Sequence, residues 1–190
     1  RRSGVLTELY QPIGDDGRFY ALGSADYEVT EQPFEVLDQS IALFSSQVSR
    51  GGAEIGFYPN DHWQLSTGLQ FGRHHLDRLI GSSDIAEHNS FSSGAWTFGA
   101  TYDTLDDVGF PTRGSRFDAA LRAFRPGLGS DEEADVVRLR FDRPIDTRLG
   151  TLLIGAQADW ALTGRDSGEA ITTLGGFGRL TGLRENERVG

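Results

Sequence analysis

The chain has 190 residues, a net charge of −10, 25 glycines, and neither cysteine nor methionine. An acidic chain without a basic stripe is a poor binder of nucleic acid, and the lack of cysteine excludes disulfides, thiol nucleophiles and zinc–thiolate sites. No apolar run reaches about 18 residues, which excludes a transmembrane helix but not a membrane β-barrel, whose strands carry only a weak alternating signal.

Alternation of apolar and polar residues with period two is the main pattern along the chain. It predicts eight β-strands, at residues 4–12, 18–31, 42–58, 63–75, 90–105, 115–125, 134–145 and 151–163. Many of them match or exceed the roughly 9–11 residues that a tilted strand needs to cross a bilayer, whereas about five or six is usual in soluble sheets. The pattern therefore favours an all-β, antiparallel, up-and-down membrane fold.

The early strands differ in how cleanly they alternate. In the second predicted strand, Phe19 and Tyr27 share one side, and Asp26 lies on the other. The third, residues 42–58, fits least well, and its Gly51-Gly52 pair predicts a bulge that changes the pairing register. From Trp63 to Gly72 the alternation is clean again.

The later strands place their charges opposite the apolar residues. In residues 151–163, for example, Leu152 and Trp160 oppose Gln157 and Asp159. The charged residues of this kind are Arg116, Asp118, Arg122, Arg138, Arg140, Asp142 and Asp159. In a barrel they would form cross-strand pairs that line a wet lumen. A soluble sheet with one solvated side produces the same pattern.

The predicted connections alternate between short and long. The short ones are 14–17, 59–62, 106–114 and 146–150, and the long ones are 32–41, 76–89, 126–133 and 164–182. Short turns on one side and long loops on the other are typical of outer-membrane barrels. Tyr58, Trp63, Tyr102 and Phe110 lie beside the short turns and predict an aromatic girdle at the membrane interface, although aromatics near turns are also common in other β proteins.

We predict no catalytic, cofactor-binding or metal-ligating residue in this chain. The Gly-x-Ser-x-Gly elbow of a lipase is absent, and the Asp16-Gly17 pair is read as a tight hairpin turn. His74 and His75 are adjacent on a strand, so their side chains should point to opposite faces and cannot easily share an ion. The acidic residues 131–135 could hold Ca²⁺, but they lack EF-hand spacing and are read as a solvated loop.

Residues 103–117 resemble the periplasmic turn of the bacterial surface antigen superfamily. The resemblance is carried by Asp103, Phe110, Pro111 and Gly114. Proline fixes φ, glycine permits a left-handed backbone, and the aspartates can accept local backbone hydrogen bonds. The superfamily holds outer-membrane barrel-assembly insertases and their translocator relatives.

Residues 173–187 resemble the inward-folded sixth external loop of the same superfamily. The matching positions are Gly175, Gly176, Leu180, Thr181, Gly182 and Leu183. The family carries Val-Arg-Gly-Phe or Val-Arg-Gly-Tyr at the loop tip, and Thr181 stands in place of that arginine, so the family's inward salt bridge is not carried over to this position. The sequence of this segment most resembles that of the barrels that follow patatin-like phospholipase domains.

The resemblance implies how the chain would fit into a larger barrel. The superfamily barrel has about sixteen strands, and residues 151–163 would be the strand before the sixth loop. Residues 1–190 would then form one partial outer-membrane barrel domain of about eight strands, incomplete at both ends. Because open sheet edges do not survive in lipid, either the missing strands would come from the rest of a longer chain, or the fragment is not embedded as it stands.

We therefore expect an anchor or translocator for an attached polypeptide, with a patatin-like phospholipase as the passenger. The expected location is the outer membrane of a Gram-negative bacterium, and the expected partners are outer-membrane lipid or lipopolysaccharide and a covalently attached passenger or periplasmic domain. No nucleic acid and no cofactor are expected, and the oligomeric state stays open. Any lipase activity would belong to another part of the parent protein. The alternatives are an insertase of the same superfamily and a soluble β-sandwich binding domain.

Overall fold

The computed structural model describes residues 2–36, 39–81, 88–164, 173–174 and 188–189. Its long strands are β1 (Arg2–Ile13), β2 (Phe19–Val36), β3 (Gln39–Asn60), β4 (Trp63–Gly81), β5 (His88–Asp103), β6 (Arg116–Phe124), β7 (Ala134–Thr147) and β8 (Gly150–Thr163). A 3-10 helix, η1 (Pro126–Leu128), and the short strands β9 (Thr173–Leu174) and β10 (Arg188–Val189) are the other elements. No helix among the described residues has the length and apolar character to cross a membrane.

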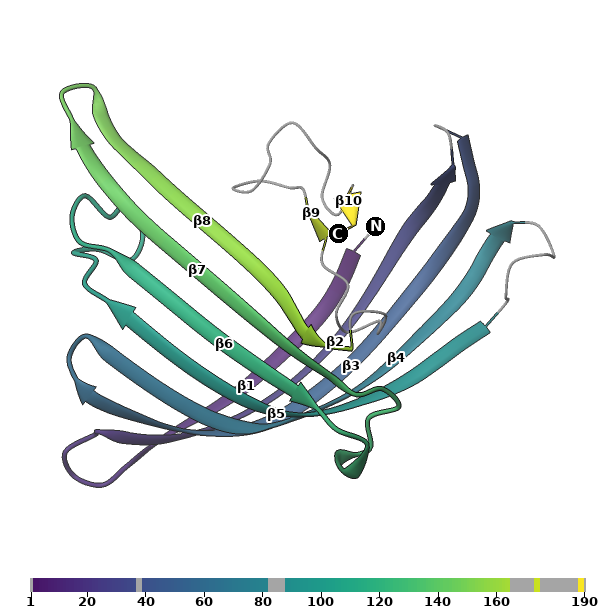
Figure 1. Cartoon of the computed structure of the whole chain (residues 1–190), viewed down its shortest axis with the longest axis horizontal. Coiled ribbons are helices and arrows are strands. Elements are labelled where there is room, and N and C mark those ends of the chain that lie inside the picture. The colour runs from purple at the N-terminus through teal and green to yellow at the C-terminus, as the bar shows by residue number, and fades with distance from the viewer. Residues whose placement is uncertain (1, 37–38, 82–87, 165–172, 175–187, 190) are drawn as a thin grey trace.

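The long strands form one antiparallel sheet in which each strand pairs with its neighbour in sequence. The order is β1-β2-β3-β4-β5-β6-β7-β8, so β1 and β8 lie at the two edges, and β9 pairs with β10 in a separate ribbon. The sheet is strongly curved, so that in Figure 1 β6 to β8 slant the opposite way from β1 to β4. The predicted all-β, up-and-down architecture is confirmed, and each of the eight predicted strands is present.

The connections lie at two opposite ends of the sheet. At the turn end, the links are residues 14–18, 61–62, 104–115 and 148–149. They gather on one side of Figure 1. The first of these turns contains Gly14 and Gly17 with positive φ, and the Arg18 amide donates to Asp16 Oδ1 at 3.2 Å, as the Asp-Gly prediction requires. We call the opposite end the loop end.

The predicted long connection at residues 32–41 is wrong. The β2–β3 ladder continues from the pair Gln32 and Phe44 to the pair Val36 and Gln39, with one irregularity between Phe34 and Glu35. Polar residues and Pro33 end the apolar alternation at this point and concealed the strand. Backbone ladder hydrogen bonds do not require apolar side chains, so the hairpin extends past the region that the pattern could detect.

The predicted bulge at the Gly51-Gly52 pair is also wrong. Both glycines lie in an unbroken ladder, where Gly51 pairs with Ala25 and Gly52 with Ser24. A Cβ at Gly52 would lie 2.8 Å from the Leu69 carbonyl oxygen on β4. At Gly52, glycine therefore permits close approach of the neighbouring strand, which is the other common reason for glycine inside a strand.

The strand register divides the side chains into two faces. We call one the apolar face; its large residues are Val5, Leu9, Ile13, Phe19, Tyr27, Ile55, Phe57, Trp63, Leu65, Leu69, Phe71, Trp96, Phe98, Tyr102, Phe117, Leu121, Val137, Leu139, Phe141, Ile145, Leu152, Ile154 and Trp160. Among the described residues, its charged members are Glu31, Arg73, Asp77 and Asp135 on the loop-end side and Arg143 on the turn-end side; Arg73 and Glu31 lie well inside their strands.

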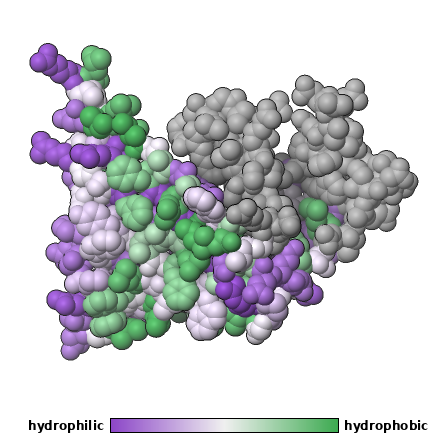
Figure 2. All heavy atoms as spheres, in the orientation of Figure 1, coloured by the Kyte–Doolittle hydropathy of each residue, from purple (hydrophilic) through white to green (hydrophobic). Residues whose placement is uncertain are grey.

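The apolar face is exposed rather than packed under a second layer. Trp96, Phe141 and Trp160 are 46%, 38% and 66% exposed. Figure 2 shows hydrophilic residues gathered along the edge that carries the short turns, with hydrophobic residues behind them. A β-sandwich would bury such residues in a dry core between two sheets, so this arrangement does not match the sandwich alternative.

The opposite face, which we call the polar face, carries most of the charges and most of the burial. Tyr20, the largest fully buried side chain described, lies on this face and is 1% exposed. Ala95 on β5, Phe124 on β6 and Ala134 on β7 form a small buried cluster near the loop end. Gly94 O accepts from the Arg125 amide, and the link that contains η1 therefore folds back on β5.

Candidate functional site

The ladder register brings opposite charges directly across from one another on the polar face of β5 to β8. Arg116 is opposite Asp103 on one side and Asp142 on the other. Asp118 is opposite Arg140, and Arg138 is opposite Asp159. Directly opposed residues in a sheet have Cβ atoms about 4.5–5.5 Å apart, so each charge meets a partner of the other sign.

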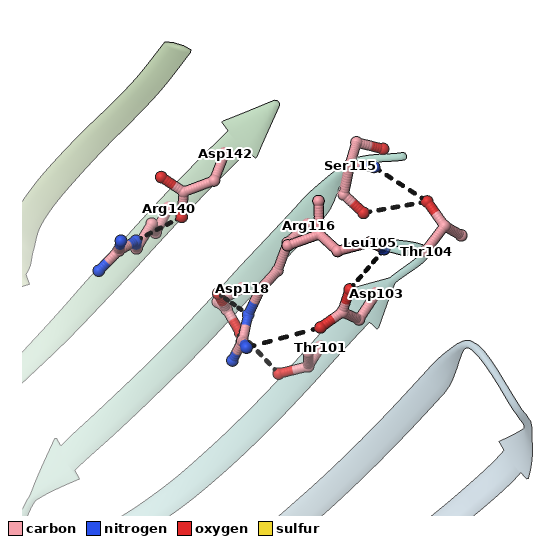
Figure 3. A network of polar contacts seen from close by, with 9 residues as sticks. All are labelled: Thr101, Asp103, Thr104, Leu105, Ser115, Arg116, Asp118, Arg140 and Asp142. Carbon is pink, nitrogen blue, oxygen red and sulfur yellow. Dashed lines mark hydrogen bonds and ion pairs between the residues drawn. The ribbon is translucent and has the colours of Figure 1, made fainter. Parts of the chain in front are cut away.

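Arg116 is the centre of this network (Figure 3). Its Nε lies 2.9 Å from Asp118 Oδ2, and its Nη1 lies 3.5 Å from Asp103 Oδ2. Thr101 Oγ1 donates to Asp118 Oδ1 at 2.8 Å. One guanidinium therefore ties neighbouring strands together, and a hydroxyl satisfies part of the remaining acceptor capacity of the carboxylate.

Further contacts extend the network to β7 and β8. Arg140 Nε donates to Asp142 Oδ2 at 2.6 Å, and Arg138 Nε donates to Asp159 Oδ1. Asp159 also accepts from Gln157 Nε2 at 2.7 Å. The result is a surface of paired charges rather than a concentrated patch of one sign.

All seven residues predicted to line a lumen lie on this one face. Arg116, Asp118, Arg138, Arg140, Asp142 and Asp159 make the contacts above, and Arg122 is opposite Thr97 on the same face. The register therefore brings these seven together. That they line a water-filled lumen stays a prediction.

The Arg138–Asp159 pair gives a testable prediction. Arg138→Asp should destabilise the assembled protein by about 1 kcal/mol or more because it places two carboxylates opposite each other. The double variant Arg138→Asp/Asp159→Arg should recover most of that loss. The measurement is the melting temperature of the full-length protein in detergent, read from the change in its gel mobility on heating. No recovery in the double variant would contradict a direct pair.

A second part of the polar face was missed by the sequence prediction. On β2 and β3, Arg50 Nη2 lies 3.0 Å from Asp26 Oδ2 and 3.9 Å from Glu28 Oε2. Arg50 was missed because the third strand fits the alternation least well. The register, which sets Arg50 opposite Asp26, identifies Arg50 as part of the polar face.

Near the turn end, Tyr20 organises an aromatic and polar cluster that the sequence prediction also missed. Tyr20 Oη donates to Glu54 Oε1 at 3.0 Å and accepts from Gln64 Nε2 at 2.5 Å. The rings of Tyr10 and Tyr58 both lie 5.3 Å from the Tyr20 ring, centroid to centroid. The Tyr20 ring covers Gly56, where a Cβ would collide with it.

The middle of the polar face is hollowed. A hollow of about 250 Å³ is bordered by Glu54, Gln70 and Arg122. Its floor is made of small residues on several strands, including Ser24 and Gly52. Glu54, Gln70 and Arg122 give its rim groups that can hydrogen-bond water.

The link at residues 104–115 is an ordered turn built on backbone hydrogen bonds to aspartate side chains. Asp106 Oδ1 accepts from the Thr112 amide at 2.8 Å and from the Arg113 amide at 3.0 Å. Asp107 Oδ1 accepts from the Gly109 and Phe110 amides at 2.8 and 2.7 Å. These contacts hold the chain before and after Pro111 in one compact shape.

The four predicted turn residues have different places in this link. Asp103 Oδ1 accepts from the Leu105 amide at 2.9 Å and also faces Arg116. Gly114 has a φ of 91°, and a Cβ there would collide with the Thr104 carbonyl oxygen, so only glycine fits without strain. Phe110 is 89% exposed, and Pro111 follows it at the tip.

Asp106 is held in its ionised form by these donors. The Thr112 hydroxyl and then the Arg113 and Thr112 amides lower its pKa from 3.8 to about 2. Hydrogen bonds to a carboxylate favour the charged form. Because the pKa of Asp106 in the folded turn lies below its ordinary value, its stabilising contribution is full above about pH 4 and is lost as the pH falls through 3.8 toward 2.

We expect the Thr112 and Arg113 amides to stay protected from hydrogen exchange at neutral pH and to lose protection between about pH 4 and pH 2. Asp106→Ala should remove that protection throughout the range, because it removes the acceptor. Asp15→Ala, in the turn between β1 and β2, is the matched control. Protection that persists in Asp106→Ala would show that the carboxylate does not hold the turn.

The aromatic residues predicted to form a girdle do not all share a face. Trp63 and Tyr102 pair across β4 and β5 on the apolar face, with ring centroids 5.1 Å apart. Tyr58 was placed wrongly: it lies on the polar face with Tyr20. Its position one residue from Phe57 sends it to the other side of the strand. The girdle itself stays a prediction for Trp63 and Tyr102.

The histidines 74 and 75 and the acidic residues 131–135 make contacts within the sheet and its links. His74 stacks on Phe91 at 4.3 Å, whereas His75 Nε2 lies 3.5 Å from Asp77 Oδ2 on the other face. Asp131 Oδ2 accepts from the Ser92 amide at 2.6 Å. No group of three or more potential metal ligands occurs among the described residues.

The predicted sixth-loop motif lies outside the described residues. This applies to Gly175, Gly176, Leu180, Thr181, Gly182 and Leu183. Its inward fold therefore stays a prediction.

Comparison with known proteins identifies the fold. No family model matches the sequence, and no curated protein matches it. The structure is similar to that of BamA from Haemophilus ducreyi lacking POTRA domains 1-3, with a TM-score of 0.76 and 16% sequence identity. The match covers 97% of this chain and 38% of that chain, so the chain spans well under half the length of the protein it matches. The sheet therefore has the fold of part of a BamA-like β-barrel.

Proposed function

We propose that residues 1–190 are part of an outer-membrane β-barrel of a Gram-negative bacterium. The observation that carries the proposal is the two-sided sheet, with large apolar side chains exposed on one face and paired charges on the other. Exposed apolar patches on soluble proteins rarely exceed a few hundred Å². A face this extensive is stable when acyl chains cover it, and the charged face then encloses water.

The charge distribution supports the same proposal. A lysine or arginine at mid-bilayer on the lipid face costs about 2–4 kcal/mol, and the cost falls toward the interfaces. Arg143 lies two residues beyond Phe141 toward the turn end, and Arg73 lies two residues beyond Phe71 toward the loop end, so both flank the central apolar stretch where that cost is largest. The edges at β1 and β8 need partners in lipid, which the remaining strands of a longer chain would supply.

The role of this barrel is to anchor, and to help export, an attached polypeptide. The support is the resemblance of residues 103–117 and 173–187 to the surface antigen superfamily. The second segment is closest to barrels that follow patatin-like phospholipase domains, so a phospholipase is the passenger we propose. The described residues of this chain would contribute binding and positioning, and the hydrolysis would take place in the passenger.

The second candidate is an insertase of the same superfamily. The likeness of the sheet to BamA favours it, because that likeness extends over nearly the whole chain. The two candidates share the barrel and differ in the attached domain. A Gly-x-Ser-x-Gly elbow upstream in the full-length protein supports the phospholipase, and periplasmic domains without that elbow support the insertase.

Fractionation of cells that express the full-length protein tests the shared part of the proposal. We expect the protein in the outer-membrane fraction, resistant to carbonate or urea extraction, with gel mobility that changes on heating. Phospholipase activity in that fraction, abolished by Ser→Ala in the elbow, tests the passenger. Recovery of the protein in the soluble fraction without detergent would refute the barrel.

A further inference from the structure

The apolar face is not smooth between β1 and β5. Two hollows of about 410 and 420 Å³ adjoin each other there and share Ile55 and Thr67 in their linings. The hollow nearer the turn end reaches Phe19 and Leu65, and the other reaches Leu9 and Trp96. Together they form a groove on the side that would face lipid.

Small residues on β2 and β3 form the floor of this groove. Ala21, Gly23 and Ala53 line the hollow nearer the loop end, with Leu9 on one flank and Leu69 on the other. The ladder continues this floor toward the loop end through the pair Ala25 and Gly51. The small residues thus run along β2 from Ala21 to Ala25, with the large rings of Phe19 and Phe57 at the turn end.

Beyond the loop end of the groove, four residue steps past Gly23, the apolar face becomes polar and cationic. Tyr27, Ser49 and Arg73 form one row across β2, β3 and β4, and Ser92 continues it on β5. Arg73 is exposed, and it has no ion pair or hydrogen bond to another described residue. Asp77, the acid four residues farther along β4, already lies 3.5 Å from His75.

An acyl chain is long enough to reach the groove from the row of Arg73. From Tyr27 to Gly23, where the hollow nearer the loop end begins, there are four residue steps, about 13 Å at 3.3 Å per residue. At a strand tilt of about 45° this is roughly 9 Å along the membrane normal, compared with about 15 Å for one leaflet of a hydrocarbon core. An acyl chain in the leaflet at the loop end, with its headgroup beside Arg73, would therefore enter the hollow bordered by Gly23 and Ala53.

We propose that this groove binds one acyl chain of a phosphate-bearing lipid, with the phosphate held by Arg73 and the Ser49 hydroxyl. Guanidinium groups recognise phosphate through parallel hydrogen bonds, and a neighbouring hydroxyl supplies a further donor. The inference rests on the proposed function, because it requires the apolar face to lie in a bilayer.

Trp96 lines the groove and reports on it directly. The full-length protein is placed in phosphatidylcholine nanodiscs containing increasing amounts of phosphatidylglycerol with brominated acyl chains, which quench nearby tryptophan fluorescence. The Trp96 signal is the difference between the parent and Trp96→Phe. We expect quenching of this signal to saturate at a low fraction of brominated phosphatidylglycerol, and brominated phosphatidylcholine to give only a gradual, non-saturating rise.

Two variants separate the headgroup from the groove. Arg73→Gln should raise the half-saturating lipid fraction about two- to fivefold, the effect of losing an exposed charge pair. Ala53→Phe should abolish the saturating phase because it fills the floor. Ala119→Phe, an equivalent change on the same face of β6 outside both hollows, should leave it intact. An excess of inorganic phosphate should not displace the lipid.

The outcomes that overturn the inference are distinct from those that overturn the barrel. Non-saturating quenching of Trp96 by both lipids, unaffected by Arg73→Gln, would refute the groove site but leave the barrel in place. Displacement of the lipid by inorganic phosphate would show that a phosphate alone is bound, which also refutes the groove. Failure of every brominated lipid to quench Trp160, measured through Trp160→Phe, would refute the proposed function itself.

Discussion

Arginine at Leu69 is expected to prevent stable assembly of the full-length protein in the outer membrane, whereas arginine at the next residue, Gln70, is expected to be tolerated. Leu69 lies in the middle of the apolar face, opposite Ala53 and Trp96. A guanidinium there would meet acyl chains at a cost of about 2–4 kcal/mol. Gln70 borders the polar hollow, where a guanidinium meets water and the nearby Glu54.

The comparison uses two adjacent positions on one strand, so it separates the face from the strand itself. Both variants are expressed as full-length protein, and the folded fraction is measured by heat-dependent gel mobility and by recovery from the outer membrane. We expect a large loss of folded protein for Leu69→Arg and nearly parental amounts for Gln70→Arg. Equal losses, or the reverse order, would contradict the assignment of the two faces.

A methyl group at Gly56 is expected to destabilise the assembled protein by about 2–4 kcal/mol, the combined cost of overpacking and of losing buried hydrogen bonds. Tyr20 lies flat over Gly56, and a Cβ there would collide with the ring. The ring would have to leave a position in which it is 1% exposed. It would also lose its hydrogen bonds to Glu54 and Gln64.

Gly23→Ala is the matched control. Gly23 lies on β2, next to the strand that carries Gly56, and a Cβ at Gly23 would have no atom within 4 Å. Thermal melting of the two full-length variants in detergent measures the difference. A Gly56→Ala variant as stable as Gly23→Ala would mean that the Tyr20 ring does not need the space above Gly56. Tyr20→Phe keeps the ring but removes the hydroxyl contacts to Glu54 and Gln64, so its melting temperature measures the contribution of those hydrogen bonds alone.

The strands and their faces could be predicted because alternation acts on every residue of a sheet that is apolar on one side. Trp96 and Trp160 fell on the predicted apolar side, and Arg138 and Asp159 on the other, because the period of two is fixed by strand geometry. The turn at residues 104–115 was also accessible, since Asp106, Pro111 and Gly114 each restrict the backbone locally.

The errors occurred where local rules do not determine the structure. The β2–β3 hairpin continues through Pro33 because pairing between two chain segments, rather than composition, decides where a strand ends. The Tyr20 cluster depends on a contact with Gly56 across the sheet and on Gln64 two strands away, which alternation cannot reveal. Tyr58 was assigned to the girdle because it lies close to a turn. Its position next to Phe57 in the alternation puts it on the other face, with Tyr20.

Spin labels along β4 test the central claim most directly, because residues 1–190 contain no cysteine and single cysteines can be introduced one at a time. Labels at positions 63 to 72 of the full-length protein in a bilayer are compared for collisions with oxygen, which concentrates in lipid, and with a water-soluble nickel complex. We expect odd positions, from Trp63 to Phe71, to favour oxygen and even positions, from Gln64 to Gly72, to favour nickel. Equal accessibility at odd and even positions, or the reverse alternation, would contradict it.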